Sequence, residues 1–541
     1  MSTANHDNGA KPSVDQVEYR GDGGKLKTEQ QEHATGDVVI ISGTDHVRRI
    51  PIPSDDPNDP LRFSTWRKMG IVFTCCWFSN FSLLSPSGIG TFFNALFQLY
   101  LPAQTTSQIV GLATYPSMVM AFGSLVLLPL AIVFGRRPIF ICAVLIAIVS
   151  SIGGAISKTF QSHFISRIFL GLATGVTESL LPLIISDVTF LDERSFYFGI
   201  YWASQNAVST GLLIALSYAT AALSWRWFYW IFVITLAIGA VFVVFLNPET
   251  KFYRSPTAVN GQVVFTDDLG TTHILSDKEA EARFGGVQQH MTNASAIEKK
   301  SFWQNLVPFT KPAPGGFKLW LSVYSKIFMC CTSPGVIFAT LSSSIALGIG
   351  IAITLIYSNI LVEDYHWSPG SVGLFNVGVI PACFLAMFYS GFCADKINIW
   401  LAKRNGGVHT PEHHLIHLII PCITGAIGII AIAVTINTPQ KHSYWGFLIG
   451  WAIYQFSFVC ILITTTTFAA EVIPGSPGAA MVVVIGGKNI ISFGASYGLM
   501  PMVHLYSYQT AFMILLGIYL AIFALGIPVY FLNRIWKKRV L

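Results

Sequence analysis

The chain has 541 residues, of which 52% are hydrophobic and only 11% are charged. A soluble domain carries about a quarter charged residues, so this chain has too few charges to cover a surface in water and needs lipid around it. Its net charge of +6 does not indicate a nucleic-acid partner, because Lys and Arg fall at the ends of apolar runs instead of forming one basic patch.

The chain begins with a polar segment of mixed charge that is rich in Gly, Asp and Glu. This segment contains no apolar stretch of the kind found in a signal peptide, so the first long apolar segment is expected to direct membrane insertion. We predict a disordered cytoplasmic tail over residues 1–63.

Twelve apolar segments follow, each close to the roughly 20 residues that a helix needs to cross a bilayer. They lie near residues 69–93, 108–132, 138–157, 163–187, 198–222, 226–246, 334–358, 370–393, 415–436, 444–469, 479–503 and 509–533. A hydrophilic insert separates the first six from the last six. The predicted parts are an N-terminal six-helix half over 64–247, a cytoplasmic linker over 248–330, a C-terminal six-helix half over 331–533 and a cytoplasmic tail over 534–541.

Basic residues in the short loops predict the orientation, because Lys and Arg accumulate on the cytoplasmic side of a membrane. With the N-terminus inside, the inner loops hold six of them: Arg136, Arg137, Arg194, Lys396, Lys403 and Arg404. The outer loops hold three: Lys158, Arg226 and Lys441. We predict a multi-pass protein of the plasma membrane with both termini in the cytoplasm.

The two halves share a short repeat. The fifth segment reads QNAVSTG over residues 205–211 and the eleventh reads KNIISFG over residues 488–494, so both contain Asn-x-x-Ser-x-Gly. An acidic residue followed by Val ends the preceding segment of each half, at Asp187 and Glu471, 19 and 18 residues before the shared Asn. Duplicated units of this kind bind substrate between the halves, near the middle of the membrane. The predicted fold is therefore an all-α membrane protein with 12 transmembrane helices in two six-helix, pseudo-symmetric halves.

Several motifs carry a resemblance to a known family. A GRRP turn follows the second segment at 135–138, and a Gly-x-x-x-Asp-Lys motif follows the eighth at 391–396. The fourth segment and the loop after it read RIFLGLATGVTESLLPLIISDVTFLDERS, and WRWFYW and PET come later. Over roughly residues 60–540 the chain resembles the major facilitator superfamily, and within it the fungal drug:proton antiporter-like branch that includes histidinol and polyamine permeases.

The resemblance implies that residues in these motifs control the movement of the halves. We assign conformational or gating roles to seven residues: Gly135, Arg136, Arg137, Arg167, Asp187, Gly391 and Asp395. The chain departs from the superfamily at Ile132, which stands where the family has an acidic residue three positions before the GRR glycine. A charge relay is therefore not carried over to the first half, whereas Asp395 can fill the corresponding role in the second.

Glu178 is the most informative single residue, because it lies inside the fourth apolar segment. A carboxylate there costs roughly 3 kcal/mol even on a lenient insertion scale. We predict that Glu178 carries a coupled proton; the alternative is a structural carboxylate satisfied by another helix. Arg167 lies 11 residues earlier on the same side of the helix, and both a functional and a structural interpretation are open for it.

Lys488 and two asparagines are the matching polar residues of the repeat. Lys488 either faces the cavity as a cation that counters a carboxylate or attracts anionic groups, or it reaches the cytosolic interface with its long side chain. Asn206 and Asn489 either contact substrate or form hydrogen bonds between helices. Their symmetric placement fits both interpretations.

Aromatic and amide side chains in four segments are the substrate-binding candidates. They are Trp77, Asn80, Trp202, Gln205, Asn206, Tyr454, Gln455, Lys488 and Asn489. Aromatic faces with a few amides suit amphipathic or cationic organic solutes. The alternative for each aromatic residue is simple packing or contact with lipid.

The residues together favour a secondary active transporter of small organic molecules such as a drug, a secondary metabolite or a cationic amine. We expect proton coupling and alternating access, with export favoured over uptake on the breadth of the family. One alternative is a proton-driven uptake permease for polyamines or related amines, and another is a transporter-like nutrient sensor.

An enzyme is not expected, because the sequence has no phosphate-binding loop and no serine nucleophile elbow. His413, His414 and His417 follow a loop and are interpreted as an interface feature, so we predict no metal and no other cofactor. The expected partners are a small-molecule substrate, protons and the lipid bilayer, with no nucleic acid and a monomeric chain.

Overall fold

The structure is a computed structural model of the chain. It describes residues 38–39, 56–89, 93–101, 103–222, 224–252, 257–259, 262–266, 272–276, 301, 304, 316–368, 371–405, 408–473 and 477–540. Most of the predicted tail over residues 1–63 and most of the predicted linker over 248–330 lie outside the described residues.

Six long helices form the N-terminal half. They are α1 (Thr65–Ser87), α3 (Thr106–Phe134), α4 (Arg136–Ile156), α5 (Phe160–Val188), α6 (Arg194–Ala222) and α7 (Trp225–Leu246), with the short α2 (Phe93–Tyr100) between α1 and α3. Hydroxyl residues begin several of them, because the side chains of Ser64, Thr105 and Thr159 each accept a hydrogen bond from a backbone N–H of the first turn.

The C-terminal half is also built of six membrane-crossing units, three of them composite. They are α12 (Pro334–Glu363); η4 (Val372–Asn376), α13 (Val379–Ala386), the π-helix η5 (Met387–Cys393) and α14 (Ala394–Arg404); α15 (His413–Ile416) and α16 (Ile419–Asn437); α17 (Tyr444–Val472); α18 (Pro477–Leu505); α19 (Tyr508–Ala524) and α20 (Gly526–Val540). A further helix, α11 (Gly316–Cys330), precedes this half.

Within the described ranges, ten of these units are long and apolar enough to cross a membrane by composition alone. The other two are α1 and α6. Their polar side chains point inward: Asn80 and Ser82 of α1 and Gln205 of α6 are all buried. Together the twelve units confirm the predicted fold, an all-α membrane protein of two six-helix halves.

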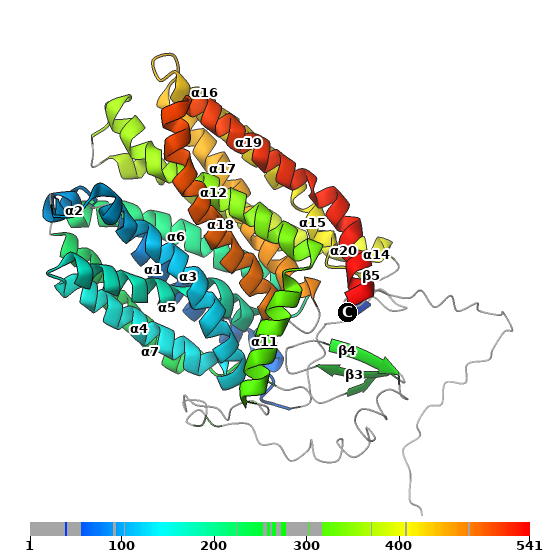
Figure 1. The fold of residues 1–541 in the computed structure, drawn as a ribbon. Coiled ribbons are helices and arrows are strands. Elements are labelled where there is room, and N and C mark those ends of the chain that lie inside the picture. The colour runs from blue at the N-terminus through cyan, green and yellow to red at the C-terminus, as the bar shows by residue number, and fades with distance from the viewer. Residues whose placement is uncertain are drawn as a thin grey trace, which may run out of the picture.

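The helices of each half form one group, and the two groups meet along their length (Figure 1). Across the boundary α18 packs against α3 and α5, and α6 packs against α13, η5 and α17. Helix α11 lies against α3 and α18. We call the end of the bundle at which α1 begins and α20 ends the terminal face.

The π-helix η5 marks a close approach between the halves. The predicted gating residue Gly391 lies in η5, and a Cβ built on Gly199 of α6 would be 3.2 Å from the Cα of Gly391. Two glycines facing each other let the backbones meet, which larger side chains would prevent. π-Helical turns inside helices frequently occur at functional sites.

Glycines also allow α3 and α5 to cross closely beside the candidate site. A Cβ on Gly175 would lie 2.6 Å from both the carbonyl oxygen of Met120 and the amide nitrogen of Ser124, which are backbone atoms of α3. Neither backbone atom can move aside as a flexible side chain can.

Replacing Gly175 by Ala is therefore expected to push the two helices apart and to destabilise the fold by about 1–3 kcal/mol, the usual cost of overpacking. Thermal unfolding of purified protein measures this effect. The matched control is Gly211→Ala in α6, where a Cβ would meet nothing within 4 Å. Equal unfolding midpoints for both variants would contradict the close-packing argument.

Two segments within the predicted linker and tail have regular secondary structure. The linker contains a three-stranded antiparallel sheet of β2 (Thr257–Val259), β3 (Gln262–Thr266) and β4 (Thr272–Ser276). Residues 534–540 continue helix α20, and Lys537 in that helix is fully buried, 2.8 Å from the carboxylate of Glu412. A second small sheet pairs β1 (Val38–Val39) with β5 (Val408–His409) in antiparallel register.

Candidate transport site

Glu178 and Lys488 lie at equal depth in helices of opposite halves. Glu178 comes ten residues before the end of α5, and Lys488 comes eleven residues after the start of α18. At 1.5 Å per residue both lie about 15 Å from the terminal ends of their helices. Because a bilayer core is about 30 Å thick, this depth corresponds to the middle of the membrane.

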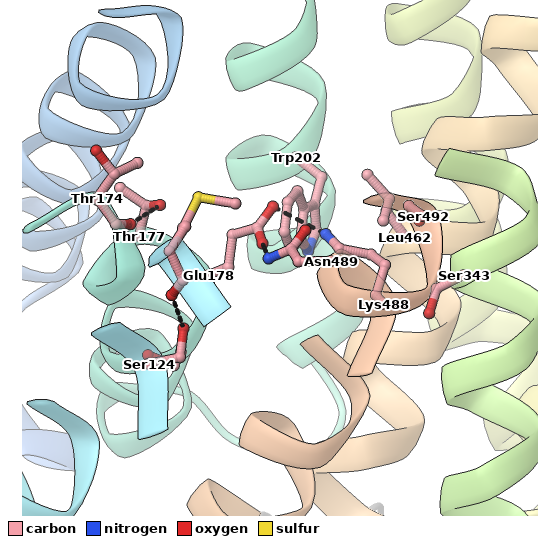
Figure 2. A network of polar contacts seen from close by, with 12 residues as sticks. Ser124, Thr174, Thr177, Glu178, Trp202, Ser343, Leu462, Lys488, Asn489 and Ser492 are labelled. Carbon is pink, nitrogen blue, oxygen red and sulfur yellow. Dashed lines mark hydrogen bonds and ion pairs between the residues drawn. The ribbon is translucent and has the colours of Figure 1, made fainter. Parts of the chain in front are cut away.

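These two residues form a buried ion pair between the halves (Figure 2). The Nζ of Lys488 donates to Oε1 of Glu178 at 2.8 Å, and the Nδ2 of Asn489 donates to Oε2 at 2.8 Å. The Lys488 ammonium also lies 5.3 Å from the ring centroid of Trp202 on α6. The side chains of Glu178 and Lys488 are 5% and 2% exposed, so water hardly reaches the pair.

This arrangement decides between the alternatives for Lys488, which does not reach the membrane surface but pairs with a carboxylate. Removing two charges from water costs several kcal/mol each, and their attraction offsets that cost only while both remain charged and hydrogen-bonded. Protonation of Glu178 would abolish the ion pair and leave Lys488 without its counter-charge. The pair is therefore chemically suited to link one proton to contact between the halves.

The charges break the internal symmetry of the chain. Aligning Asp187 with Glu471 places Leu462 at the position of Glu178, and aligning the shared asparagines places Gln205 at the position of Lys488. Leu462 lies beside Lys488 in Figure 2. Among the described residues, one half thus supplies the acid and the other the base of the ion pair that joins the halves at this depth.

Several predicted substrate-binding residues have buried polar atoms with no hydrogen-bond partner in the described part of the chain. They are Asn80 (Oδ1) on α1, Trp202 (Nε1) and Gln205 (Oε1) on α6, and Gln455 (Oε1) on α17. Helix α6 contacts both α1 and α17, so these atoms belong to neighbouring helices on the two sides of the boundary. Buried polar atoms are nearly always paired, so such unpaired atoms are suited to bind a ligand or water.

Three other candidates have partners within their own half. The indole of Trp77 donates to the carbonyl of Thr235 at 2.9 Å. The hydroxyl of Tyr454 donates to the carbonyl of Ala346, and the amide of Asn206 donates to the carbonyl of Trp202 in its own helix. These contacts suit helix packing, whereas Asn489, the repeat partner of Asn206, reaches across to Glu178.

Arg167 forms hydrogen bonds to several helices of the N-terminal half. Its side chain is fully buried, and it donates to the carbonyl of Leu112 at 2.6 Å and to the hydroxyl of Tyr229 at 3.0 Å. It therefore does not extend to the membrane surface. The arginine links α5 to α3 and α7.

The GRRP turn is held by two acidic residues at the terminal face. Gly135 has φ of 109°, a conformation that favours glycine, and Arg136 donates from Nε to Asp187 at 3.0 Å. The carboxylate of Glu249 accepts the backbone N–H groups of Arg136 and Arg137 at 2.9 and 3.3 Å, which places a negative charge at the start of α4. The role of Glu249 was missed from the sequence, although PET was one of the motifs noted.

The halves meet at the terminal face through polar contacts on one side and apolar contacts on the other. Asp395 of α14 accepts the backbone N–H of Phe196, in the first turn of α6, at 3.0 Å, and Arg194 lies 3.6 Å from Glu471 of α17. The corresponding helix start in the other half is that of α18. There the Cδ1 of Ile132 lies 3.7 Å from the position that a Cβ on Gly478 would take. Ile132 thus provides an apolar contact where the superfamily has a charged one.

Removing the Asp395 carboxylate is expected to open the terminal face. An acceptor at a helix start contributes about 1 kcal/mol, so Asp395→Ala should change the ratio of two conformers roughly fivefold. Asp395→Asn, which keeps an acceptor oxygen, should fall between Asp395→Ala and the parent protein. Spin labels at Phe134→Cys and Trp400→Cys, in a cysteine-free background, report the distance across this face. The control is Asp364→Asn, which alters an exposed carboxylate and should leave the distance distribution unchanged. If Asp395→Ala also left the distance distribution unchanged, the prediction would be refuted.

Two pseudo-symmetric halves with a polar site between them are the architecture of a membrane carrier. The chain belongs to the major facilitator superfamily, whose family model matches residues 69–496. This is a family of carriers and not of enzymes.

Individual relatives agree with this family. The chain is 24% identical to an uncharacterized MFS-type transporter of Schizosaccharomyces pombe, over 86% of this chain and 83% of the relative. It is 22% identical to the protein HOL1 of Saccharomyces cerevisiae, over 91% of this chain and 90% of that protein.

Solved structures share the fold at low identity. The proton:xylose symporter XylE aligns with a TM-score of 0.57 at 13% identity, covering 88% of this chain and 96% of that one. The human organic anion transporter MFSD10 (TETRAN) aligns with a TM-score of 0.54 at 14% identity, covering 85% of this chain and 99% of that one. At these identities the likeness concerns the fold alone.

Proposed function

We propose that the chain is a proton-coupled transporter of small organic molecules, of the drug:proton antiporter-like branch, that exports its substrates across the plasma membrane. The observation that carries the proposal is the buried ion pair between Glu178 and Lys488, which joins the two halves at mid-depth. The terminal face is the cytoplasmic side in this proposal, because the basic short loops lie there.

The coupling step follows from the ion pair. With Glu178 ionised, the pair holds α5 to α18; when Glu178 takes up a proton, the attraction to Lys488 is lost and the halves can separate. A cationic substrate that approaches the carboxylate competes with that proton for the same negative charge. Proton and substrate therefore exchange at one residue, which is the chemical basis of antiport.

The lining around the pair supports cationic or amphipathic organic substrates. Trp202 offers an aromatic face, which attracts cations, and the unpaired amide oxygens of Asn80, Gln205 and Gln455 are acceptors for substrate N–H groups. A carboxylate with aromatic and amide neighbours suits an organic amine better than an anion.

The test is substrate-driven proton movement in liposomes that contain only the purified chain and a pH indicator. A panel of cationic and amphipathic amines is added to vesicles with and without an imposed pH gradient. We expect at least one compound to drive protons in the direction opposite to its own movement. Proton movement in the same direction as the compound would favour uptake, and bound ligands that never cross the membrane would favour the sensor alternative.

A further inference from the structure

A second buried cluster, away from Glu178, lies where the loop after α14 meets the end of α17. The Nε2 atoms of His409 in β5 and His414 in α15 both lie 3.0 Å from Oε2 of Glu471. All three residues are more than nine-tenths buried. The proposed transport step does not involve them.

The three side chains present a metal-binding donor set. Their ligand atoms, two imidazole nitrogens and one carboxylate oxygen, all lie within 4.8 Å of one another. Ligand atoms on one tetrahedral zinc ion at about 2.0–2.1 Å are about 3.3 Å apart, so small side-chain movements would close the set around an ion. Two histidines and a glutamate are a known zinc ligand combination that leaves the fourth position open.

The surroundings supply the partner that His414 needs if it binds a metal, whereas Nδ1 of His409 has no hydrogen-bond partner in the described part of the chain. The Nδ1 of His414, the ring nitrogen that does not contact Glu471, lies 3.2 Å from Nδ2 of Asn398. The Oδ1 of Asn398 lies 2.9 Å from Nε2 of His417. An imidazole that binds a metal through Nε2 must donate from Nδ1, and turning over the Asn398 amide provides the acceptor. The hydrogen bond of Asn398 thus fits both the free and the metal-bound state.

We propose that His409, His414 and Glu471 form a binding site for a divalent transition metal, zinc in the first place. This assignment replaces the sequence interpretation of His413, His414 and His417 as an interface feature. His413 has no atom in the donor set, although it is buried beside the cluster.

The metal site is coupled to contact between the halves. Glu471 is also the residue that Arg194 of the other half approaches at 3.6 Å. A bound dication would neutralise the carboxylate and repel the guanidinium. Metal binding and closure of the terminal face therefore oppose each other, and zinc favours the conformer in which this face is open.

Calorimetric titration of the full-length protein in detergent, after treatment with a chelator, tests the site with zinc ions alone. We expect one zinc per chain, and His409→Ala, His414→Ala and Glu471→Gln should each weaken binding about tenfold or more. The matched control is His413→Ala, which removes a buried histidine of the same loop and should leave the affinity unchanged. Equal affinity in the parent protein and the ligand variants would overturn the proposal.

Cobalt binding keeps the test decisive if a ligand variant fails to fold. The parent protein should show the visible absorption bands of tetrahedral Co²⁺ when cobalt is added, and zinc should abolish them. Lack of these bands together with no saturable zinc binding would refute the site.

Arg194→Gln tests the coupling separately. Removing the competing guanidinium should tighten zinc binding at least about fivefold, the low end of typical coupling between sites. An affinity equal to that of the parent protein would refute the coupling while leaving the metal site itself in place.

Discussion

Glu178→Gln is expected to abolish substrate-driven proton flux and to weaken the exchange of cationic substrates. Glutamine has the shape of a protonated glutamate and can still bond to Asn489, but it cannot bind and release a proton. A transporter whose coupled proton moves through Glu178 then becomes fixed in the protonated form. Counterflow of a labelled cationic substrate between two equal pools should also fall, because the variant lacks the negative charge at which substrate and proton exchange.

Two variants provide the controls. Glu363→Gln removes an exposed carboxylate at the end of α12 and should leave coupled flux unchanged. Glu178→Asp keeps an ionisable group but shortens its reach to Lys488, so coupled flux should fall without disappearing. Full proton flux in Glu178→Gln would mean that the proton travels elsewhere and that the ion pair is structural.

The two halves and both charged residues of the site could be predicted from the sequence. Long apolar runs define spans regardless of tertiary structure, and a charge inside such a run is rare enough to attract attention. Glu178 and Lys488 were found for that reason. Their pairing could not be predicted, because they lie 310 residues apart and meet only when the halves dock.

The direction in which each side chain points was the main gap. A helix in lipid carries apolar residues on all sides, so the sequence does not indicate which face is buried against protein. Trp77 and Tyr454 looked equivalent to Trp202, yet they pack within their own halves, whereas Trp202 lies beside Lys488. Gly175 carried no sequence signal at all, since its role depends on the backbone of α3.

The cluster of His409, His414 and Glu471 shows the same limit at the terminal face. The spacing of His413, His414 and His417 drew attention to this loop, but it did not indicate which side chains meet there. Only His414 of the three binds Glu471, and the second histidine is His409 from the preceding strand. Glu471 comes 57 residues after His414, and only the return of α17 to this face brings it there.

Lys488→Met is expected to be strongly destabilising. It leaves Glu178 as a buried carboxylate without a counter-charge, and breaking a buried pair from one side costs about 3–5 kcal/mol. For a unit of the size of one half, this cost lowers the unfolding midpoint by roughly 6–20 °C. Thermal unfolding in detergent, followed by tryptophan fluorescence, measures the shift.

The double variant Glu178→Gln/Lys488→Met separates stability from coupling. With both charges removed, no ion is left buried and unpaired, and such replacements are often neutral or stabilising. The double variant should therefore unfold near the parent protein, about 1 kcal/mol apart at most, yet still lack substrate-driven proton flux. Lys396→Met, which removes a lysine near the ring of Phe392, should change neither property.

If the double variant were as unstable as Lys488→Met alone, the cost would come from lost packing and not from the unpaired charge. If it regained proton flux, the pair would serve stability alone and the proton would need another carrier.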